Sequence, residues 1–241
     1  MVKRLGIIVQ AHMGSTRLPN KMLHIIKDKT VLGHVICRLK NVSNADDLII
    51  ATSDLYADDA IIAECEKYYV NFYRGDDKDV LSRFFNAAIK YELSDIARVC
   101  ADNTLLDFEV IENEIDAYRT GKYALVCPSD NLPLGLGCEI FSFSMLKDAY
   151  NNGKQSYHRE HVTPYIYENY DKPYRPKYST DLRKYRFTLD TYEDLQLIEQ
   201  IYEKVYRGED NFLLKDVIGE MERHPEWIKI NENIRQKSVY A

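Results

Sequence analysis

Short apolar runs alternate with amphipathic segments along most of the chain, and this alternation restricts the fold more than any other feature. The apolar runs predict buried strands at residues 5–9, 48–54, 70–75, 97–102 and 124–130. Helical patterns lie between them at residues 30–40, 57–68, 79–91 and 108–119. Strands that alternate with helices predict an α/β fold whose central sheet is largely parallel.

The second half of the chain is less regular. Further strands are expected within residues 134–143 and at 185–190, and helices at 192–206 and 212–224. Prolines and clustered tyrosines between about 150 and 185 predict an excursion from the main sheet. A length of 241 residues suits one large α/β domain, so we expect residues 1–241 to form a single domain.

Charge and hydropathy exclude several classes of function. A formal net charge of -6 argues against nucleic-acid binding, although local basic residues can still hold a small anion. No apolar run approaches the ~20 residues that span a bilayer, and the run after Lys3 and Arg4 is too short for a signal peptide. We therefore expect a cytoplasmic protein. The five cysteines form no CxxC pair, which is typical of reduced, structural thiols.

The loop "QAHMGSTRLPNK" (residues 10–21) follows the first apolar run directly. Gly14 allows a positive φ or a close backbone approach, and successive amides after a strand can form an anion nest. Arg17 and Lys21 are the two kinds of cation that usually bind phosphate, and Pro19 disfavours a continuous helix between them. These residues alone leave two interpretations in balance, a phosphate-binding loop and an ordinary polar turn.

Two carboxylates lie at the ends of predicted strands, Asp102 in "VCADNTLLD" and Asp190 in "FTLDTYEDL". Ligand crevices of α/β sheets lie beyond the carboxyl ends of the strands, so both side chains can meet at one edge. Mg²⁺ favours one or two carboxylates together with phosphate oxygens. The alternative for Asp190 is an acid at the start of a helix that Thr191 caps.

The segment "QAHMGSTRLPNKML" resembles the signature loop of the cytidylyltransferases that activate acidic sugars, the CMP-Kdo and CMP-sialate synthetases. It is more similar still to the spore-coat polysaccharide biosynthesis F-type branch of that superfamily. Further matching blocks follow in the same order: "IIATSD", "RGDDKDVLSRFFNAA", "RVCADNTLLD", "LGLGCEIFSFSML", "REHVTPYIYEN" and "RFTLDTYEDLQLI". The resemblance therefore covers nearly the whole chain.

The resemblance implies a single nucleotidyltransferase domain with a Rossmann-like, three-layer α/β/α fold and a mostly parallel mixed sheet. An acceptor oxygen, from a sugar hydroxyl or a phosphate, would attack the α-phosphate of a nucleoside triphosphate and expel pyrophosphate. CTP is the expected donor, Mg²⁺ the cofactor and a sugar or sugar acid the acceptor, for surface polysaccharide or glycan synthesis. The resemblance also implies a homodimer that forms through residues 150–185, without nucleic acid or membrane partners.

The same resemblance implies a role for each matching position. The phosphates would contact Ala11, His12, Met13, Gly14 and Ser15 together with Arg17 and Lys21, the two cations expected to act in catalysis. Asp102 and Asp190 would hold Mg²⁺ against the α-phosphate. The base and ribose would lie near Ala51, Thr52, Ser53, Arg74, Gly75 and Asp77, and the acceptor near Glu139, Arg159 and His161.

Four positions depart from the family pattern or have more than one possible role. The family usually has arginine where this chain has His12, which would lie near the triphosphate. Glu139 lies in an apolar strand, where an acid is costly unless paired, although an outward, solvated position is also open. His161 is either a hydrogen-bonded helix residue or an acceptor contact and general base. Arg83 is expected to be a structural ion-pair partner.

Two further departures concern the acceptor side of the predicted site. Asn103 and Thr104 replace the Cys-Pro that commonly follows the strand-end aspartate. The stretch "SDNLPLGLGCEIF" also lacks a basic residue often found before the glycines. Both changes favour an unusual acceptor, whose identity the sequence leaves open.

Two other classes of function remain open beside nucleotidyl transfer from CTP, GTP or UTP. A glycosyltransferase that uses a nucleotide sugar also combines a similar sheet with an aspartate–metal pair. A triphosphate site needs cations for three phosphates, so Arg17 and Lys21 favour the nucleotidyltransferase. A non-catalytic binder with the same fold is supported by His12 alone, and the joint presence of Lys21, Asp102 and Asp190 argues against it.

Overall fold

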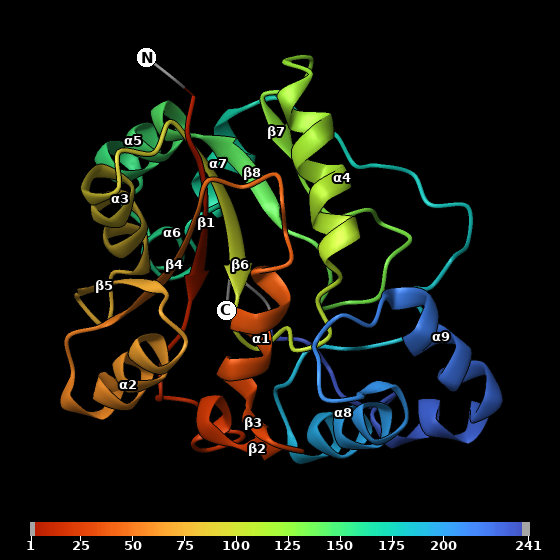
Figure 1. The fold of residues 1–241 in the computed structure, drawn as a ribbon. Helices are drawn as coiled ribbons and strands as arrows, with labels where there is room; N and C mark the ends of the chain where they lie inside the picture. Colours follow the sequence, from red (N-terminus) through yellow and green to blue (C-terminus); the bar gives the residue numbers. More distant parts are fainter. Residues whose placement is uncertain (1–2, 238–241) are drawn as a thin grey trace.

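The computed structural model describes residues 3–237, and its centre is a six-stranded sheet (Figure 1). The strands are β1 (Leu5–Gln10), β4 (Asp47–Ser53), β5 (Asn71–Gly75), β6 (Asp95–Cys100), β7 (Leu125–Val126) and β8 (Glu139–Ser142). Their order across the sheet is β5-β4-β1-β6-β8-β7. The first four of these in sheet order are parallel, and β8 runs antiparallel to both of its neighbours. The sheet is therefore mixed and mostly parallel, as the sequence predicts.

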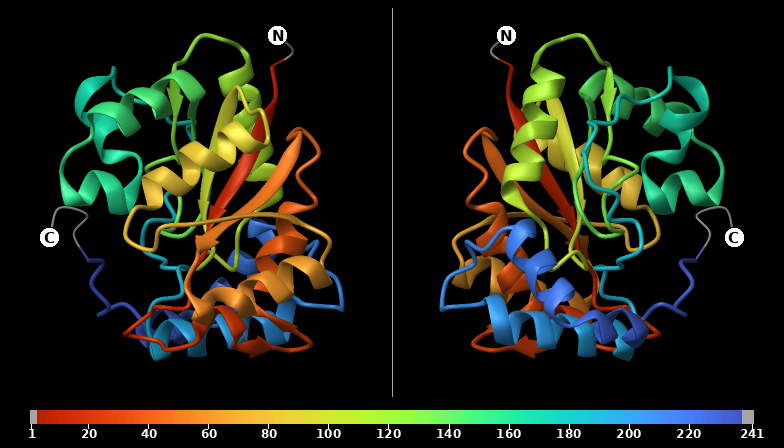
Figure 2. Two further views of the ribbon diagram at one scale, coloured as in Figure 1. Left: turned by 90° about the vertical axis from the view of Figure 1, so that its left-hand side faces the viewer. Right: turned by 90° about the vertical axis from the view of Figure 1, so that its right-hand side faces the viewer.

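Helices cover both faces of this sheet and make three layers (Figure 2). One face packs against α1 (Val31–Leu39), α2 (Asp59–Lys67), α4 (Phe108–Arg119), α8 (Tyr192–Val205) and α9 (Leu214–Arg223). The other packs against α3 (Val80–Lys90), α5 (Phe143–Asn152) and α7 (Pro164–Asn169), and α6 (Ser156–His161) packs on α3. Short 3-10 turns at Lys21–Leu23, Tyr56–Asp58 and Pro225–Ile230 and a hairpin of β2 (Ile25–Ile26) and β3 (Lys29–Thr30) complete the described elements. The three-layer α/β/α prediction is confirmed.

Strand β1 shows why these residues form the centre of the molecule. Side chains alternate between the two faces of a strand, so Ile7 and Val9 enter the core below α1 and α4, and Ile8 enters the core below α3 and α5. All three are at most 1% exposed. A strand buried on both faces needs an apolar residue at every position, which is what the first apolar run provides.

Helix starts follow the local capping signals of the sequence. The Thr30 side chain accepts a 2.9 Å hydrogen bond from Gly33 N and begins α1. Asp79 accepts from Ser82 N and begins α3, and Thr191 caps α8. Side-chain oxygens at these positions satisfy amides that have no partner within the helix. The predicted helices are confirmed with ends shifted by one or two residues.

The predicted strand at 185–190 is not present. This segment makes a single bridge, between Leu134 and Arg186. Its other backbone bonds are isolated, such as the one from Leu189 N to Asp102 O at 2.8 Å. Its alternate apolar side chains are buried, as they would be in a strand: Tyr185, Phe187 and Leu189. An extended segment needs an adjacent strand to form a ladder, and the chain beside this one is an irregular loop.

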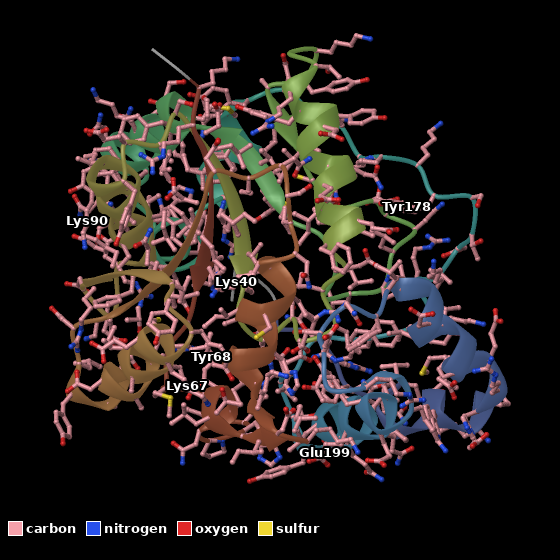
Figure 3. All side chains as sticks on the ribbon, in the orientation of Figure 1. Lys40, Lys67, Tyr68, Lys90, Tyr178 and Glu199 are labelled. Carbon is pink, nitrogen blue, oxygen red and sulfur yellow. The ribbon has the colours of Figure 1, made fainter. Side chains whose placement is uncertain are left out.

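The excursion in the second half packs against its own chain. Tyr174 exchanges two backbone hydrogen bonds with the β7 region, and its ring stacks on Tyr123 with centroids 3.8 Å apart. Tyr178 lies beside α4 (Figure 3). All five cysteines are free thiols, as expected. Within residues 3–237, the helices are too short or too polar to cross a bilayer.

Candidate active site

A cavity of about 1400 Å³ opens at the carboxyl ends of the parallel strands. It lies over the boundary between β1 and β6, where the chain stops adding strands on one side and begins on the other. Ligands of open α/β sheets bind at such a switch point. Pockets for one small molecule are roughly 300–1,000 Å³, so this cavity has room for a nucleotide and a second substrate.

Most residues predicted for the site line this cavity. They are Ala11, His12, Met13, Gly14, Ser15, Arg17, Lys21, Asp77, Asp102, Glu139, Arg159, His161 and Asp190. Five predicted residues do not line it: Ala51, Thr52, Ser53, Arg74 and Gly75. The structure thus brings together residues from the loops after β1, β5 and β6 with residues from β8, α6 and the segment before α8.

Lys21 lies at the centre of a cluster of charges on the floor of the cavity. Its Nζ atom donates to Asp102 Oδ2 at 2.9 Å, to the Leu189 carbonyl at 2.8 Å and to Asp190 Oδ1 at 3.4 Å. The lysine is 6% exposed. All three of its N–H donors therefore join the opening loop to the end of β6 and to the segment before α8.

Asp190 is held from several sides by cations. Arg17 lies 3.2 Å from its Oδ1 atom, and Arg186 donates to its Oδ2 atom at 2.8 Å. Burial alone would raise the pKa of Asp190, but the charges of its three cationic neighbours outweigh burial and hold that pKa below its usual value. Asp190 is therefore ionised at neutral pH and fixed in orientation.

Asp194 supports this arrangement from behind. It is fully buried and accepts from the Arg186 guanidinium, from the amides of Asp190 and Thr191, and from Asn231. The carboxylate thereby fixes both the side chain that holds Asp190 and the backbone of Asp190 itself. Arg186 and Asp194 were not predicted, and their 2.9 Å contact depends on an irregular segment that folds back on the start of a helix.

Asp102 and Asp190 are the carboxylates that would hold a magnesium ion at this point, where Lys21 Nζ contacts both of them. One oxygen each of Asp102 and Asp190 lies within 3.4 Å of the same ammonium nitrogen, so the two carboxylates face one point. Across residues 3–237 there is no cluster of three or more side chains that could hold a metal by themselves. Mg²⁺ commonly takes two carboxylates and completes its shell with phosphate oxygens and water, which is what this pair would require.

Asp58 fixes the opening loop, although no sequence motif pointed to it. Its carboxylate accepts from Met13 N at 2.8 Å, and from the hydroxyls of Thr52 at 2.9 Å and Ser53 at 2.6 Å. Burial would raise the pKa of Asp58, but these hydrogen bonds hold it below its usual value. Thr52 and Ser53 therefore act on the site through Asp58, which itself lines the cavity.

Arg74 takes a structural position in this chain. It donates to the carbonyls of Ser53 and Leu55 and pairs with Asp59 at 2.7 Å. Its guanidinium is used within the protein, outside the cavity lining. Arg74 therefore stabilises the connection between β4 and α2.

His12 lies on the cavity wall, next to Gly14. A Cβ atom on Gly14 would lie 3.3 Å from His12 Nδ1, so the glycine leaves room for the ring. Desolvation in the cavity, followed by the positive charge of Lys21, lowers the pKa of His12, and Arg83 acts in the same direction. The imidazole is therefore neutral at pH 7 in the free protein.

Arg83 differs from its expected role as an ion-pair partner. Arg83 lines the cavity, and within residues 3–237 its guanidinium makes no ion pair shorter than 4 Å and leaves Nε and Nη1 without a hydrogen-bond partner. Gly75 lies under its stem, since a Cβ there would lie 3.2 Å from Arg83 Cγ. The helical pattern of the sequence does not show that the Arg83 side chain lies in the cavity lining.

The other end of the cavity is lined by Glu139, Arg159 and His161. Glu139 is paired, because Arg98 and Tyr167 donate to it and Thr163 Oγ1 lies 3.1 Å from its Oε1 atom. Glu139 thus points inward and holds Arg98, a further cation in the cavity lining.

Arg159 and His161 lie near Glu139 but in different environments. The Arg159 guanidinium lies 3.4 Å from Asp79 and donates to the Tyr150 carbonyl at 3.1 Å. Burial lowers the pKa of His161, Glu160 opposes this shift, and the charge of Arg98 adds to it. A neutral imidazole at neutral pH can accept a proton.

Glu114 of α4 supports the glycine loop behind this end of the cavity. Its Oε2 atom accepts from Cys138 N at 2.7 Å, and burial raises the pKa of this carboxyl to about 8. Gly137 has φ +81° and a Cβ there would lie 2.5 Å from Glu114 Oε1. Glycine is therefore required where the loop crosses the helix.

Comparison with known proteins identifies the family of this chain. The sequence profile of the family described as cytidylyltransferase matches residues 6–217. The chain is 38% identical to the uncharacterized protein MJ1063 of Methanocaldococcus jannaschii, over 98% of both chains. It is 31% identical to the spore coat polysaccharide biosynthesis protein SpsF of Bacillus subtilis, over 91% of this chain and 94% of that one.

Solved structures show the same fold. A cytidylyltransferase from Leptospira borgpetersenii superposes with a TM-score of 0.88 at 28% identity, covering 98% of this chain and all of that one. A CMP:2-keto-3-deoxy-manno-octonic acid synthetase, solved with CTP, superposes with a TM-score of 0.60 at 14% identity, over 83% and 99% of the two chains. The family profile and the two sequence relatives span almost the whole chain, and on that ground the protein belongs to the cytidylyltransferase family.

Proposed function

We propose that this enzyme transfers CMP from CTP, with Mg²⁺, to an anionic sugar or sugar acid and releases pyrophosphate. The observation that carries the proposal is the convergence of Lys21, Asp102 and Asp190 on the floor of a cavity at the strand ends. Cations and a carboxylate pair at one point suit a metal-bound triphosphate better than a neutral ligand.

The opening loop is the proposed site of the β- and γ-phosphates. Asp58 holds the amide of Met13 in place, and Arg17 and Lys21 add positive charge beside it. Negative charge develops on the leaving pyrophosphate, so fixed cations lower the barrier by stabilising it. Asp102 and Asp190 would hold the magnesium ion, which supplies positive charge at the α-phosphate.

The chemical step forms one bond and breaks one bond. An acceptor oxygen forms a bond to the α-phosphorus while the bond from that phosphorus to the bridging oxygen breaks, and pyrophosphate leaves with the electron pair. A phosphate or carboxylate acceptor oxygen needs no base. A hydroxyl acceptor passes its proton to His161, whose lowered pKa keeps it neutral and able to accept.

Three arginines at the acceptor end offer guanidinium donors to an anionic acceptor. Arg98, Arg159 and Arg175 line that part of the cavity, each beside a carboxylate of the protein itself. One relative is named for spore coat polysaccharide biosynthesis, and we infer a similar use in surface polysaccharide or glycan assembly. A cytoplasmic enzyme and a homodimer through residues 150–185 are part of the same proposal. The family assignment favours nucleotidyl transfer over the glycosyltransferase and binder alternatives.

Pyrophosphate release tests the proposal. Purified enzyme is given CTP, Mg²⁺ and a panel of sugar acids, sugar 1-phosphates and neutral sugars, and pyrophosphate is measured by a coupled enzyme assay. We expect release with at least one anionic acceptor and none with neutral sugars. Release with GTP or UTP but not CTP would contradict the nucleotide assignment, and release with neutral sugars alone would contradict the acceptor class.

A further inference from the structure

Helix α6 is short, and most of its side chains lie in the cavity lining. Four of its six residues line the cavity: Ser156, Arg159, Glu160 and His161. A helix of this length is unstable in water by itself, so contacts outside the helix must fix its position. His158 lies on the buried side of α6, outside the cavity lining, with an exposed fraction of 5%.

Both ring nitrogens of His158 form contacts that hold α6 in place. The amide of Gln155 donates to Nδ1 at 3.3 Å, and Nε2 lies 2.8 Å from Oε2 of Glu168 in α7. A backbone amide can only donate, so Nδ1 bears no proton, and the ring proton lies on Nε2 and is donated to the carboxylate. His158 is therefore the neutral Nε2–H tautomer, and it ties the start of α6 to α7.

The surroundings of His158 leave its ring little freedom. The ring meets the ring of Tyr165 in α7 edge to face, with centroids 5.6 Å apart. A Cβ atom on Gly153, the residue after α5, would lie 3.2 Å from Cβ of His158. Closely packed neighbours hold a side chain in one position. The two hydrogen bonds of the imidazole therefore keep a fixed direction.

A strained turn joins α6 to α7. Its central residue, Val162, has φ +69° and ψ −58°, and the amide of Thr163 donates to the His161 carbonyl at 2.8 Å. These angles and this hydrogen bond define the γ-turn with a positive central φ, a rare and strained form. A positive φ is unfavourable for a β-branched residue and persists only where the surrounding structure enforces it. Contacts around Val162 must therefore hold the turn.

Two features of the structure enforce this turn. The side chain of Val162 is fully buried in the core below α3 and α5. The contact between His158 and Glu168 spans the turn from one helix to the other. His161, the residue before Val162, lines the cavity. The orientation of His161 therefore depends on how firmly the two helices are held together.

We propose that His158 is a positioning residue for the acceptor. As the Nε2–H tautomer it locks α6 to α7 across the Val162 turn and so holds Arg159 and His161 in the cavity lining. Reacting groups must be held in one geometry, and a displacement of about 1 Å can cost roughly a hundredfold in rate. The inference rests on the proposed function, since that function assigns the acceptor to this end of the cavity. It adds a residue that acts without contacting substrate.

Nitrogen NMR of the histidine rings in the free wild-type enzyme at pH 7.5 tests the tautomer. We expect the His158 ring to carry its proton on Nε2 and to leave Nδ1 unprotonated. A proton on Nδ1 would overturn the inference, whether the ring is neutral or an imidazolium, because the Gln155 amide would then face a second donor. This measurement needs neither substrate nor metal.

Three variants separate the two contacts of His158. His158→Leu removes both of them. His158→Gln restores the first, because glutamine at the third position of a helix accepts from the capping amide. Glu168→Gln still accepts from Nε2–H, so it preserves the second contact when the ring is neutral. His224→Leu is the matched control, since His224 also lies beside glutamates but outside the cavity lining.

The variants are compared by kcat/KM for an acceptor and by calorimetric titration with CTP. The acceptor is the sugar acid or sugar phosphate that releases most pyrophosphate in the panel described above. We expect His158→Leu to lose about tenfold to a hundredfold in kcat/KM for this acceptor, with CTP affinity unchanged. His158→Gln should recover most of the loss, and Glu168→Gln and His224→Leu should resemble the wild type.

Three kinetic results would overturn the inference. The first is wild-type acceptor kinetics in His158→Leu, and the second is an equal loss of CTP affinity, which indicates general disruption of the cavity. The third is a loss in Glu168→Gln as large as in His158→Leu, which would make the pair ionic. Should His158→Leu not fold, Glu168→Ala removes the contact between the helices and should cause a similar loss, and unchanged kinetics in that variant would overturn the inference.

Failure of the proposed function is a separate result. It would appear as a panel in which no acceptor releases pyrophosphate. The ring signals of His161 in the free enzyme then decide the inference, because they report its orientation without substrate. They should shift in His158→Leu and return in His158→Gln, and unchanged signals in His158→Leu would overturn the positioning role.

Discussion

The Nζ atom of Lys21 lies 2.9 Å from Oδ2 of Asp102, and this contact joins the loop after β1 to the end of β6. The two strands are neighbours and parallel, so their carboxyl ends lie at the same edge of the sheet. Lys21 also contacts Asp190, which lies 88 residues further along the chain than Asp102. One buried ammonium group therefore assembles the proposed catalytic centre.

Replacement of Lys21 by methionine should destabilise the fold. The variant leaves two carboxylates facing each other without their shared cation, and breaking a buried pair by removing one partner costs about 3 kcal/mol or more. Urea denaturation at pH 7.5 measures this loss. Magnesium should restore part of the stability, since it would neutralise the same carboxylates. A variant as stable as the wild type would contradict the bridging role.

Arg186 should govern magnesium affinity without contacting substrate. Its guanidinium joins Asp190 to Asp194 by three hydrogen bonds, and lysine cannot form that fork. Groups that orient a metal ligand typically change metal affinity by about 10–100-fold when mutated. In Arg186→Lys the magnesium concentration for half-maximal activity should rise by that factor, while KM for CTP at saturating magnesium changes little. An equal rise in the half-maximal magnesium concentration and in KM for CTP would indicate a general disruption of the site.

Glu114 should make stability depend on pH. Burial raises the pKa of this carboxyl from 4.5 to about 8, so the folded protein keeps a proton that the unfolded chain releases. Stability from this group is complete below pH 4.5, falls as pH rises toward about 8, and is level above that. Glu114→Gln keeps the acceptor for Cys138 N and does not titrate.

The measurement is thermal unfolding of the wild type and Glu114→Gln at pH 5 and pH 8.5. The melting temperature of Glu114→Gln should rise relative to that of the wild type as pH increases, because the glutamine side chain does not titrate. A difference in melting temperature that is the same at both pH values would show that Glu114 has an ordinary pKa in the folded protein.

His12 should bind the triphosphate more strongly in acid. Desolvation and the Lys21 charge hold its pKa below the ordinary 6.5, so the ring gains its charge as pH falls below that value. A charged imidazole forms a stronger hydrogen bond to phosphate, on the order of threefold to tenfold in affinity. His12→Arg keeps its charge at every pH and is the control, since protonation of the phosphates affects both proteins equally.

Calorimetric titration with CTP between pH 7.5 and 5.5 checks this prediction. The wild type should gain affinity over this range relative to His12→Arg. Parallel pH profiles for the two proteins would show that His12 does not contact the phosphates, and that another residue takes the place of the family arginine.

The sequence predicted those features that depend on local pattern. Apolar runs gave the parallel strands, and capping residues such as Thr30 gave the helix starts. Because parallel strands end at one edge, the positions of Arg17, Lys21 and Asp102 after β1 and β6 were enough to place them in one cavity.

Features that depend on contacts between distant loops could not be predicted. Asp58 is one of several aspartates in "SDLYADD", and only the fold shows which of them accepts from Met13 N. Arg83 was expected to have an ion-pair partner, since helical periodicity does not reveal whether a partner exists. The strand predicted at 185–190 failed for a related reason, because a strand pattern does not supply the neighbouring strand.

The most direct test of the account is the magnesium dependence of CTP binding in the wild type and in Asp190→Asn. In calorimetric titrations, magnesium should tighten CTP binding by the wild type by at least about tenfold relative to EDTA, because metal ligands and phosphate share one ion. Asp190→Asn should bind CTP about equally with and without magnesium, with Asp102→Asn behaving alike. A wild type that binds CTP equally well in EDTA, or an Asp190→Asn variant that keeps the full magnesium effect, would contradict the proposed site.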